Sequence, residues 1–116
     1  MSINEVFYRD FVKFDIRVGE IISAGELPKT RKLVEFKIDI GKERPITVIE
    51  TFAGKIDLDS VQKQKVLVIV NIVPRKLMGF ESEGILLATE LNGRIYLPGF
   101  DKSTEMPQAI NGARIK

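Results

Sequence analysis

Alternating apolar and polar positions run through much of the chain and predict β-strands. The strongest alternation spans residues 34–41, written VEFKIDIG, where every second residue from Val34 is apolar. This is the period of a half-buried strand. An earlier strand begins at residue 14 with the same period, in FDIRVG, and Gly25 and Pro28 are expected to end it.

Three later segments also have strand character. Residues 66–70 are all apolar and mostly β-branched, as is typical of a strand covered on both faces. Asn92-Gly93 has the composition of a two-residue turn, which predicts a hairpin leading back into residues 94–97. The third and fifth strands are predicted over residues 46–52 and 85–91.

The two ends of the chain carry different signals. A capping box of Ser2 and Glu5, followed by apolar residues at helical spacing that include Phe7 and Phe11, predicts an amphipathic helix over residues 1–12. Pro and Gly punctuate a C-terminal extension, residues 92–116, expected to lie along the barrel and to end in a short strand-like segment. Residues 58–65 fit one or two helical turns or a loop.

The order of these elements is three strands, a short helical or loop segment, and two further strands, all apparently antiparallel. This order predicts an all-β fold, a five-stranded OB-fold barrel over residues 13–91, with the short N-terminal helix and the C-terminal extension outside it. A sandwich has similar patterning, but closure of a barrel removes exposed strand edges. At 116 residues the chain has the size of one domain.

Composition narrows the chemistry. The chain has no cysteine and no histidine, which removes thiol nucleophiles, thiolate and imidazole metal ligands, and the commonest general base. A serine–lysine pair or a magnesium-binding carboxylate cluster remains chemically possible, but no spacing signals either. We therefore expect a protein that is not an enzyme and has no cofactor and no metal. No apolar run approaches a membrane span and no secretory signal is present, so we expect no membrane partner and a cytoplasmic location.

The net charge of +2 is weak evidence for a polyanionic partner, because phosphate binding depends on where cations gather. From the charge alone, a solvated mixed surface is the favoured explanation. Basic residues gather at Lys29, Arg31 and Lys32 and again at Arg75 and Lys76, whereas acidic residues gather at Asp57, Asp59, Glu81 and Glu83.

The most informative segment follows the fourth strand. Pro74 restricts φ, and Gly79 and Gly84 relax steric limits, so the segment is expected to form a shaped loop between the fourth and fifth strands. In OB folds this loop borders the usual nucleic-acid surface. The side chains that the loop is expected to display are Arg75, Lys76, Met78 and Ser82.

Two sequence signatures bear a family resemblance. They are DIRVG at residues 15–19 and NIVPRKLMGFESEG at residues 71–84, with Arg31-Lys32-Leu33 as a basic turn before the second strand. Over residues 11–116 the chain resembles the tRNA-binding domain that occurs as a C-terminal extension of methionyl-tRNA synthetase, as a free-standing bacterial dimer and in eukaryotic synthetase cofactors. The resemblance implies that tRNA is the ligand and is recognised at its folded corner.

The resemblance also implies which side chains bind RNA: Arg17, Lys32, Asn71, Arg75, Lys76, Met78 and Ser82. Lysine meets phosphate as a point charge, amide and hydroxyl groups can hydrogen-bond sugar or phosphate oxygens, and methionine offers an apolar contact to a base or ribose. Structural alternatives exist for four of them. Arg17 could pair with a carboxylate, Asn71 could cap a strand end, Ser82 could bond within a turn, and Met78 could fill the core.

One segment departs from the family pattern. Relatives usually carry a small serine and glycine turn after the third strand, whereas this chain has Ile49-Glu50-Thr51-Phe52-Ala53-Gly54. The RNA contacts of that turn are therefore in question. If Glu50 faces the RNA surface, its carboxylate is expected to repel phosphate.

The sequence thus favours a structure-specific tRNA-binding protein that acts alone or in trans with a methionyl-tRNA synthetase catalytic chain. A chaperone-like peptide-binding protein of the same fold family is the alternative, and a subunit that only docks on a synthetase is a third reading. A homodimer is expected, because Phe7 and Phe11 on the N-terminal helix have little barrel surface to cover them.

Overall fold

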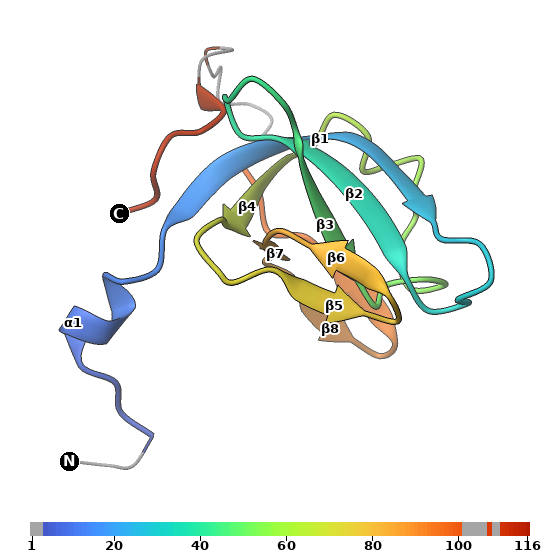
Figure 1. Ribbon diagram of the computed structural model, residues 1–116, viewed down its shortest axis with the longest axis horizontal. Helices are drawn as coiled ribbons and strands as arrows, with labels where there is room; N and C mark the ends of the chain where they lie inside the picture. The colour runs from blue at the N-terminus through green and yellow to red at the C-terminus, as the bar shows by residue number, and fades with distance from the viewer. Residues whose placement is uncertain (1–3, 101–106, 108–109) are drawn as a thin grey trace.

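A computed structural model describes residues 4–100, 107 and 110–116. Its central feature is a five-stranded antiparallel sheet in the order β3-β2-β1-β4-β7, curled into a nearly closed barrel (Figure 1). Two hairpins, β5–β6 and β8–β9, are attached to it. The elements are α1 (Tyr8–Phe11), β1 (Ile16–Glu26), β2 (Val34–Asp39), β3 (Ile46–Glu50), β4 (Lys65–Ile69), β5 (Arg75–Leu77), β6 (Phe80–Ser82), β7 (Ile85–Leu86), β8 (Thr89–Leu91) and β9 (Arg94–Tyr96). The all-β barrel class predicted from the sequence is confirmed.

The strands with the clearest alternation form as expected. In β2 buried residues alternate strictly with half-buried ones, because the face of the strand that carries Val34, Phe36 and Ile38 points into the barrel. β1 is longer than predicted, since Gly25 does not end it but pairs with Glu35 on β2. A register irregularity between Ile21 and Ser23 bends β1, so that one long strand can pair with β2 at one end and β4 at the other.

Two later strands, the fifth and the fourth, differ from the sequence prediction. The fifth strand is split into β7 and β8, and β8 pairs with β9 across the Asn92-Gly93 turn, where both residues have positive φ as the turn type requires. Residues 58–65 form turns without a helix, which agrees with the loop alternative of the prediction, and they place Val61 in the core. In β4 one face is fully buried and the other is half-buried rather than fully covered.

The core lies inside the barrel. Phe36 on β2 is fully buried and meets Phe52 edge to face, with ring centroids 6.0 Å apart. Phe52 belongs to the segment that departs from the family pattern, and its aromatic ring is buried in the core.

The N-terminal helix is shorter than predicted. It begins at Tyr8 with Phe7 as its N-cap, and no side chain caps it. Glu5 and Val6 precede the helix, and Ser2 lies outside the described residues. Figure 1 shows the helix standing away from the barrel, so it buries none of its own residues.

The described part of the C-terminal extension lies along β1, as expected. Val18 bonds through its backbone to Gly112 and Ala113, and Arg114 forms an isolated bridge with Arg17. Gly41 and Gly112 have positive φ, and a Cβ atom on either would lie 2.4 Å from a backbone oxygen of the other segment, so the approach requires glycine.

Within the described residues, no helix is both long and apolar enough to cross a membrane.

Candidate nucleic-acid interface

The segment predicted to be a loop between the fourth and fifth strands is a β-hairpin. β5 and β6 pair antiparallel, and Met78-Gly79 forms their two-residue turn with φ of 51° and 88°. Positive φ at both central residues is the property of the type I′ turn, whose twist matches a tight hairpin. Figure 1 shows this hairpin in front of the barrel, its turn pointing to the same side as the connection between β1 and β2.

The hairpin presents a cation and an apolar side chain to solvent. Met78 is 62% exposed at the tip, and Lys76 is exposed on β5, where Glu81 is its cross-strand partner. Met78 therefore does not fill the core. A methionine in the left-handed region carries a backbone cost on the order of 1 kcal/mol, which the Asn-Gly turn of the β8–β9 hairpin largely avoids.

The hairpin is attached to the free edge of β3 largely by side chains, at a contact that we call the seam (β3 with residues 82–86). The Ser82 hydroxyl accepts from the Ile49 N–H at 2.9 Å and donates to the Gly84 carbonyl at 3.0 Å. The Glu83 N–H donates to the Thr47 carbonyl at 2.8 Å. The Glu83 carboxylate accepts from the Thr47 N–H at 2.7 Å, so polar groups of the hairpin base satisfy the edge of β3.

Ser82 is fully buried, and both of its hydrogen bonds are internal. In this conformation its hydroxyl has no path to a ligand. Its local backbone bond agrees with the structural alternative considered from the sequence, and any effect of Ser82 on RNA passes through the position of the hairpin.

Glu83 also forms an ion pair with Arg44, which lies just before β3. Its carboxylate accepts from the Arg44 guanidinium at 2.9 Å and 3.4 Å. The hydrogen bonds from Arg44 and then from the Thr47 N–H hold the pKa of Glu83 below its ordinary value, and the pKa of Arg44 is raised. Glu83 is therefore ionised and fixed at neutral pH.

Glu50 lies in the seam as well. Its side chain is only 13% exposed, its Oε2 accepts from the Leu86 N–H at 2.9 Å, and the same oxygen lies 3.7 Å from Arg75 Nη2. Burial raises the pKa of Glu50, while Leu86 and Arg75 act in the opposite direction. The carboxylate is thus paired inside the seam, so the condition under which it was expected to repel phosphate, an exposed position on the RNA surface, is not met.

Lys32 approaches the same region from the connection between β1 and β2. The loop is ordered by Thr30, whose hydroxyl donates to Leu27 and accepts from Leu33, and Leu33 is buried. The Lys32 carbonyl accepts from the Ala53 N–H just beyond β3, while the Lys32 side chain is exposed. The basic loop and the hairpin are therefore anchored to the same stretch of chain, β3 and its C-terminal continuation.

Arg17 and Asn71 are committed to internal contacts elsewhere. Arg17 donates to both carboxylate oxygens of Asp15, at 2.6 Å and 3.1 Å, and to the Gly112 carbonyl. This pairing lowers the pKa of Asp15 and raises that of Arg17. The Asn71 amide accepts from the Asp15 N–H and donates to the Lys13 carbonyl, which ties the chain before β1 to the end of β4.

Of the seven residues predicted from the sequence, the structure exposes four, Lys32, Asn71, Lys76 and Met78. The amide of Asn71 is nevertheless engaged with the backbone of Asp15 and Lys13. Arg75 is partly exposed, while the side chains of Arg17, Asn71 and Ser82 hold backbone or carboxylate partners. Sequence reasoning did not find the seam role of Glu83 and Arg44, because these residues are 39 positions apart and share no local pattern.

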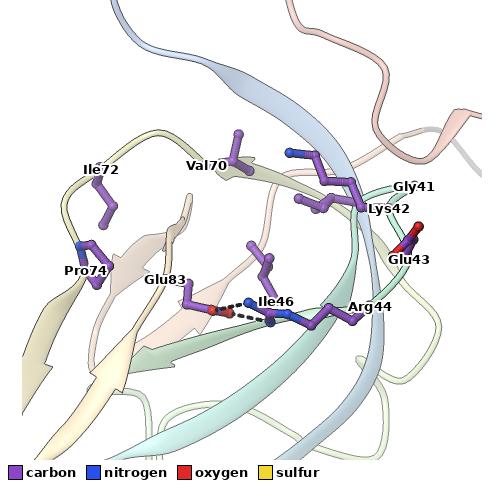
Figure 2. A pocket seen from close by; sticks show the side chains of 10 residues that line it. Gly41, Lys42, Glu43, Arg44, Ile46, Val70, Ile72, Pro74 and Glu83 are labelled. Carbon is purple, nitrogen blue, oxygen red and sulfur yellow. Dashed lines mark hydrogen bonds and ion pairs between the residues drawn. The ribbon is translucent and has the colours of Figure 1, made fainter.

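A pocket of about 680 Å³ lies behind the base of the hairpin (Figure 2). The Arg44–Glu83 pair lies along one side of the pocket. The apolar part of the pocket is formed by Ile40, Ile46, Val70, Ile72 and Pro74. Within the described ranges, no group of three or more acidic, cysteine or histidine side chains is arranged to hold a metal ion.

Comparisons with known proteins agree on one relationship. The profile of the tRNA binding domain family matches residues 16–109, most of the chain. The methionine–tRNA ligase of Christiangramia forsetii is 43% identical over 83 residues, which cover 72% of this chain but only 12% of the ligase. The chain thus spans about an eighth of the length of such relatives.

Two solved structures match over nearly their whole length. A MetRS-related protein from Pyrococcus horikoshii has a TM-score of 0.80 at 31% identity, over 97% of this chain and 99% of that one. Chaperone CsaA from Bacillus anthracis has a TM-score of 0.78 at 24% identity over the same shares, a likeness that concerns the fold alone.

Proposed function

Because this chain belongs to the tRNA binding domain family, we propose that it binds tRNA, recognises the folded corner of the molecule and performs no catalysis itself. The proposed contacts are made by Lys32, Lys76 and Met78. Arg75 lies at the edge of this surface, and its charge faces Glu50. Arg17, Asn71 and Ser82 contribute by holding the backbone that shapes it. Structured RNA is generally read through shape, phosphates and 2′-hydroxyls, which suits a small rigid surface.

The observation that carries this proposal is the exposed methionine in the hairpin turn. The part of the chain that the structure describes contains two hairpins with two-residue turns, and one uses the favoured Asn-Gly while the other places Met78 at the strained position. Backbone strain that is retained at an exposed apolar side chain is typical of a functional site. An unbranched, polarizable side chain at that tip is suited to pack against a base or ribose.

The test exchanges Met78 for the residue that the turn prefers. Met78→Asn should stabilise the fold by roughly 1 kcal/mol, because asparagine tolerates the left-handed region. It should also weaken binding of folded tRNA several-fold while leaving the salt dependence of binding unchanged, since no charge is altered. Fluorescence anisotropy with labelled tRNA and thermal unfolding measure the two effects. Equal or tighter binding by the stabilised variant would remove Met78 from the site.

The charged contacts have a separate test. Lys32→Gln and Lys76→Gln should each flatten the plot of log affinity against log salt by up to about 0.9 unit, the release expected per phosphate of a duplex. Lys63→Gln on the turn before β4 is the matched control, because it is also an exposed lysine. If all three variants flatten the plot equally, the protein attracts polyanions over its whole surface and has no defined site.

We further propose that the protein is a homodimer. Val6, Phe7, Tyr8, Phe11, Val12 and Phe14 are all more than 40% exposed around α1. A groove of about 270 Å³ beside them is completed by the C-terminal residues 114–116. A second copy would cover this apolar face, and sedimentation equilibrium should give twice the chain mass, whereas Phe11→Ser should shift the equilibrium to the monomer.

The curated relatives of this chain include methionine–tRNA ligases, so a synthetase chain is the partner that we consider first. We propose that the protein acts in the cytoplasm, alone or in trans with a methionyl-tRNA synthetase chain that lacks a domain of this kind. Co-purification of the two chains, and a lower KM for tRNA when both are present, would support the partnership. Unchanged aminoacylation kinetics would leave the protein acting alone.

The alternative function, peptide binding, is favoured by the apolar pocket behind the hairpin. Its volume lies in the range of ligand sites, and it is distinct from the exposed turn at Met78. Ile72→Asp should abolish retention of unfolded protein if the pocket binds peptides, but it should leave tRNA affinity nearly unchanged. Competition between tRNA and an unfolded protein for the immobilised chain would decide which ligand is preferred.

A further inference from the structure

Arg75 lies at the start of the hairpin, and its guanidinium group is only partly exposed to solvent. Its side chain is 40% exposed, but Nε and Nη2 are buried and have no hydrogen-bond partner within the described residues. Nη2 lies 3.7 Å from Glu50 Oε2, which is within ion-pair range but longer than a hydrogen bond. The interaction that orients Arg75 is therefore chiefly one of charge.

The carboxylate of Glu50 is fixed independently of Arg75. Its Oε2 accepts from the Leu86 N–H at 2.9 Å, and its side chain is 13% exposed. Glu50 thus belongs to the seam between β3 and β7, and it cannot swing toward solvent without leaving the Leu86 N–H unpaired. A fixed buried anion draws the guanidinium inward and balances its charge from below.

We infer that Glu50 is a specificity-determining residue, which neutralises Arg75 and so keeps the hairpin from acting as a general polyanion-binding surface. The inference rests on the proposed tRNA function. With Arg75 balanced by Glu50, the surface offers the cations of Lys76 and of the basic loop that contains Lys32. Affinity then depends more on the short-range contact at Met78, which only a folded RNA of the right shape can use.

The experiment removes the charge and keeps the hydrogen bond. Glu50→Gln retains a carbonyl oxygen for the Leu86 N–H, so the seam can still close, while Arg75 becomes an unbalanced cation. Binding of an unstructured RNA such as poly(U) should tighten, and its log–log salt slope should steepen by up to about 0.7 unit, the release expected for one further phosphate of a single strand. The ratio of folded-tRNA to poly(U) affinity should fall.

Two controls isolate the pair. Asp59→Asn changes the net charge by the same amount on the turn before β4 and should leave the slope for poly(U) unchanged. Arg75→Gln should have little effect on the slope in the parent protein but should abolish the gain in the Glu50→Gln background. The inference would be overturned if Glu50→Gln and Arg75→Gln changed the poly(U) salt slope additively in the double-mutant cycle. It would also be overturned if Asp59→Asn steepened that slope as much as Glu50→Gln does.

A second assay keeps this result separate from the proposed function. Elution from a heparin column reports cationic surface without requiring any RNA site, and Glu50→Gln should elute at higher salt than the parent and Asp59→Asn. If that shift occurs and disappears with Arg75→Gln while no variant binds tRNA, the charge balance is upheld and the tRNA function fails. If tRNA binds but Glu50→Gln elutes with Asp59→Asn, the inference fails alone. Circular dichroism and thermal unfolding verify that each variant is folded.

Discussion

Substitution of Ser82 by alanine tests whether this residue acts in the seam or on the ligand. The substitution deletes an oxygen that is 0% exposed and removes the partners of the Ile49 N–H and the Gly84 carbonyl. Leaving a buried donor unpaired costs about 1–3 kcal/mol. For a chain of 116 residues the entropy of unfolding is roughly 0.24 kcal/mol per kelvin, so the midpoint of thermal unfolding should fall by about 4–12 °C.

Thermal and urea unfolding, followed by circular dichroism, measure the loss. Ser60→Ala is the matched control, because the Ser60 hydroxyl also donates one hydrogen bond, to the Asp57 carbonyl at 2.9 Å, but from an exposed turn. That variant should lose less than about 0.5 kcal/mol. Well below its unfolding midpoint, Ser82→Ala should retain most of its tRNA affinity, with any loss caused by movement of the hairpin.

The refuting result is specific. If Ser82→Ala is no less stable than Ser60→Ala and yet binds tRNA several-fold more weakly than the parent, the hydroxyl contacts the RNA directly. The hairpin would then have to leave the seam on binding, and the internal role assigned to Ser82 would be wrong.

Two further predictions concern stability. Gly41→Ala should destabilise the fold by more than about 2 kcal/mol in urea unfolding, because φ is +78° and the new Cβ would lie 2.4 Å from the Asn111 carbonyl oxygen. A urea midpoint equal to that of the parent would show that the segments around Gly41 and Asn111 separate freely. The pKa values of Asp15 and Glu83 are lowered in the folded state, so both ionised carboxylates stabilise the fold above their ordinary pKa. The free energy of unfolding should therefore decrease as the pH falls from the ordinary carboxyl pKa to the lowered folded-state values, where these groups become protonated. The raised pKa of Glu50 works in the opposite sense and offsets part of that loss, so urea midpoints that rise steadily toward acid pH would contradict the assignment.

The strands and turns were open to prediction from the sequence because their signals are local. The alternation at residues 34–41 places one side of β2 in the core wherever its partners lie, since successive side chains point to opposite faces. Asn92-Gly93 was recognised as a hairpin turn by its two residues alone. Met78-Gly79 forms the same turn but was expected to be part of a loop, because methionine is not a residue that local statistics favour there.

The candidate site depends on contacts between residues that are far apart in the sequence, and no local pattern of residues predicts such contacts. The sequence by itself determined the barrel strands, the family signature and the clusters of basic residues, because each of these features depends on residues that are neighbours in the chain. Only the tertiary structure decided that Ser82, Glu83 and Glu50 close the barrel, because their partners Ile49, Thr47 and Leu86 lie 33 to 36 positions away and are brought near by the curling of the sheet. From the sequence, Glu50 could have been a surface anion, whereas the structure shows it largely buried in the seam and paired with Arg75. The partner of a carboxylate can be assigned only when its burial and its neighbours are known.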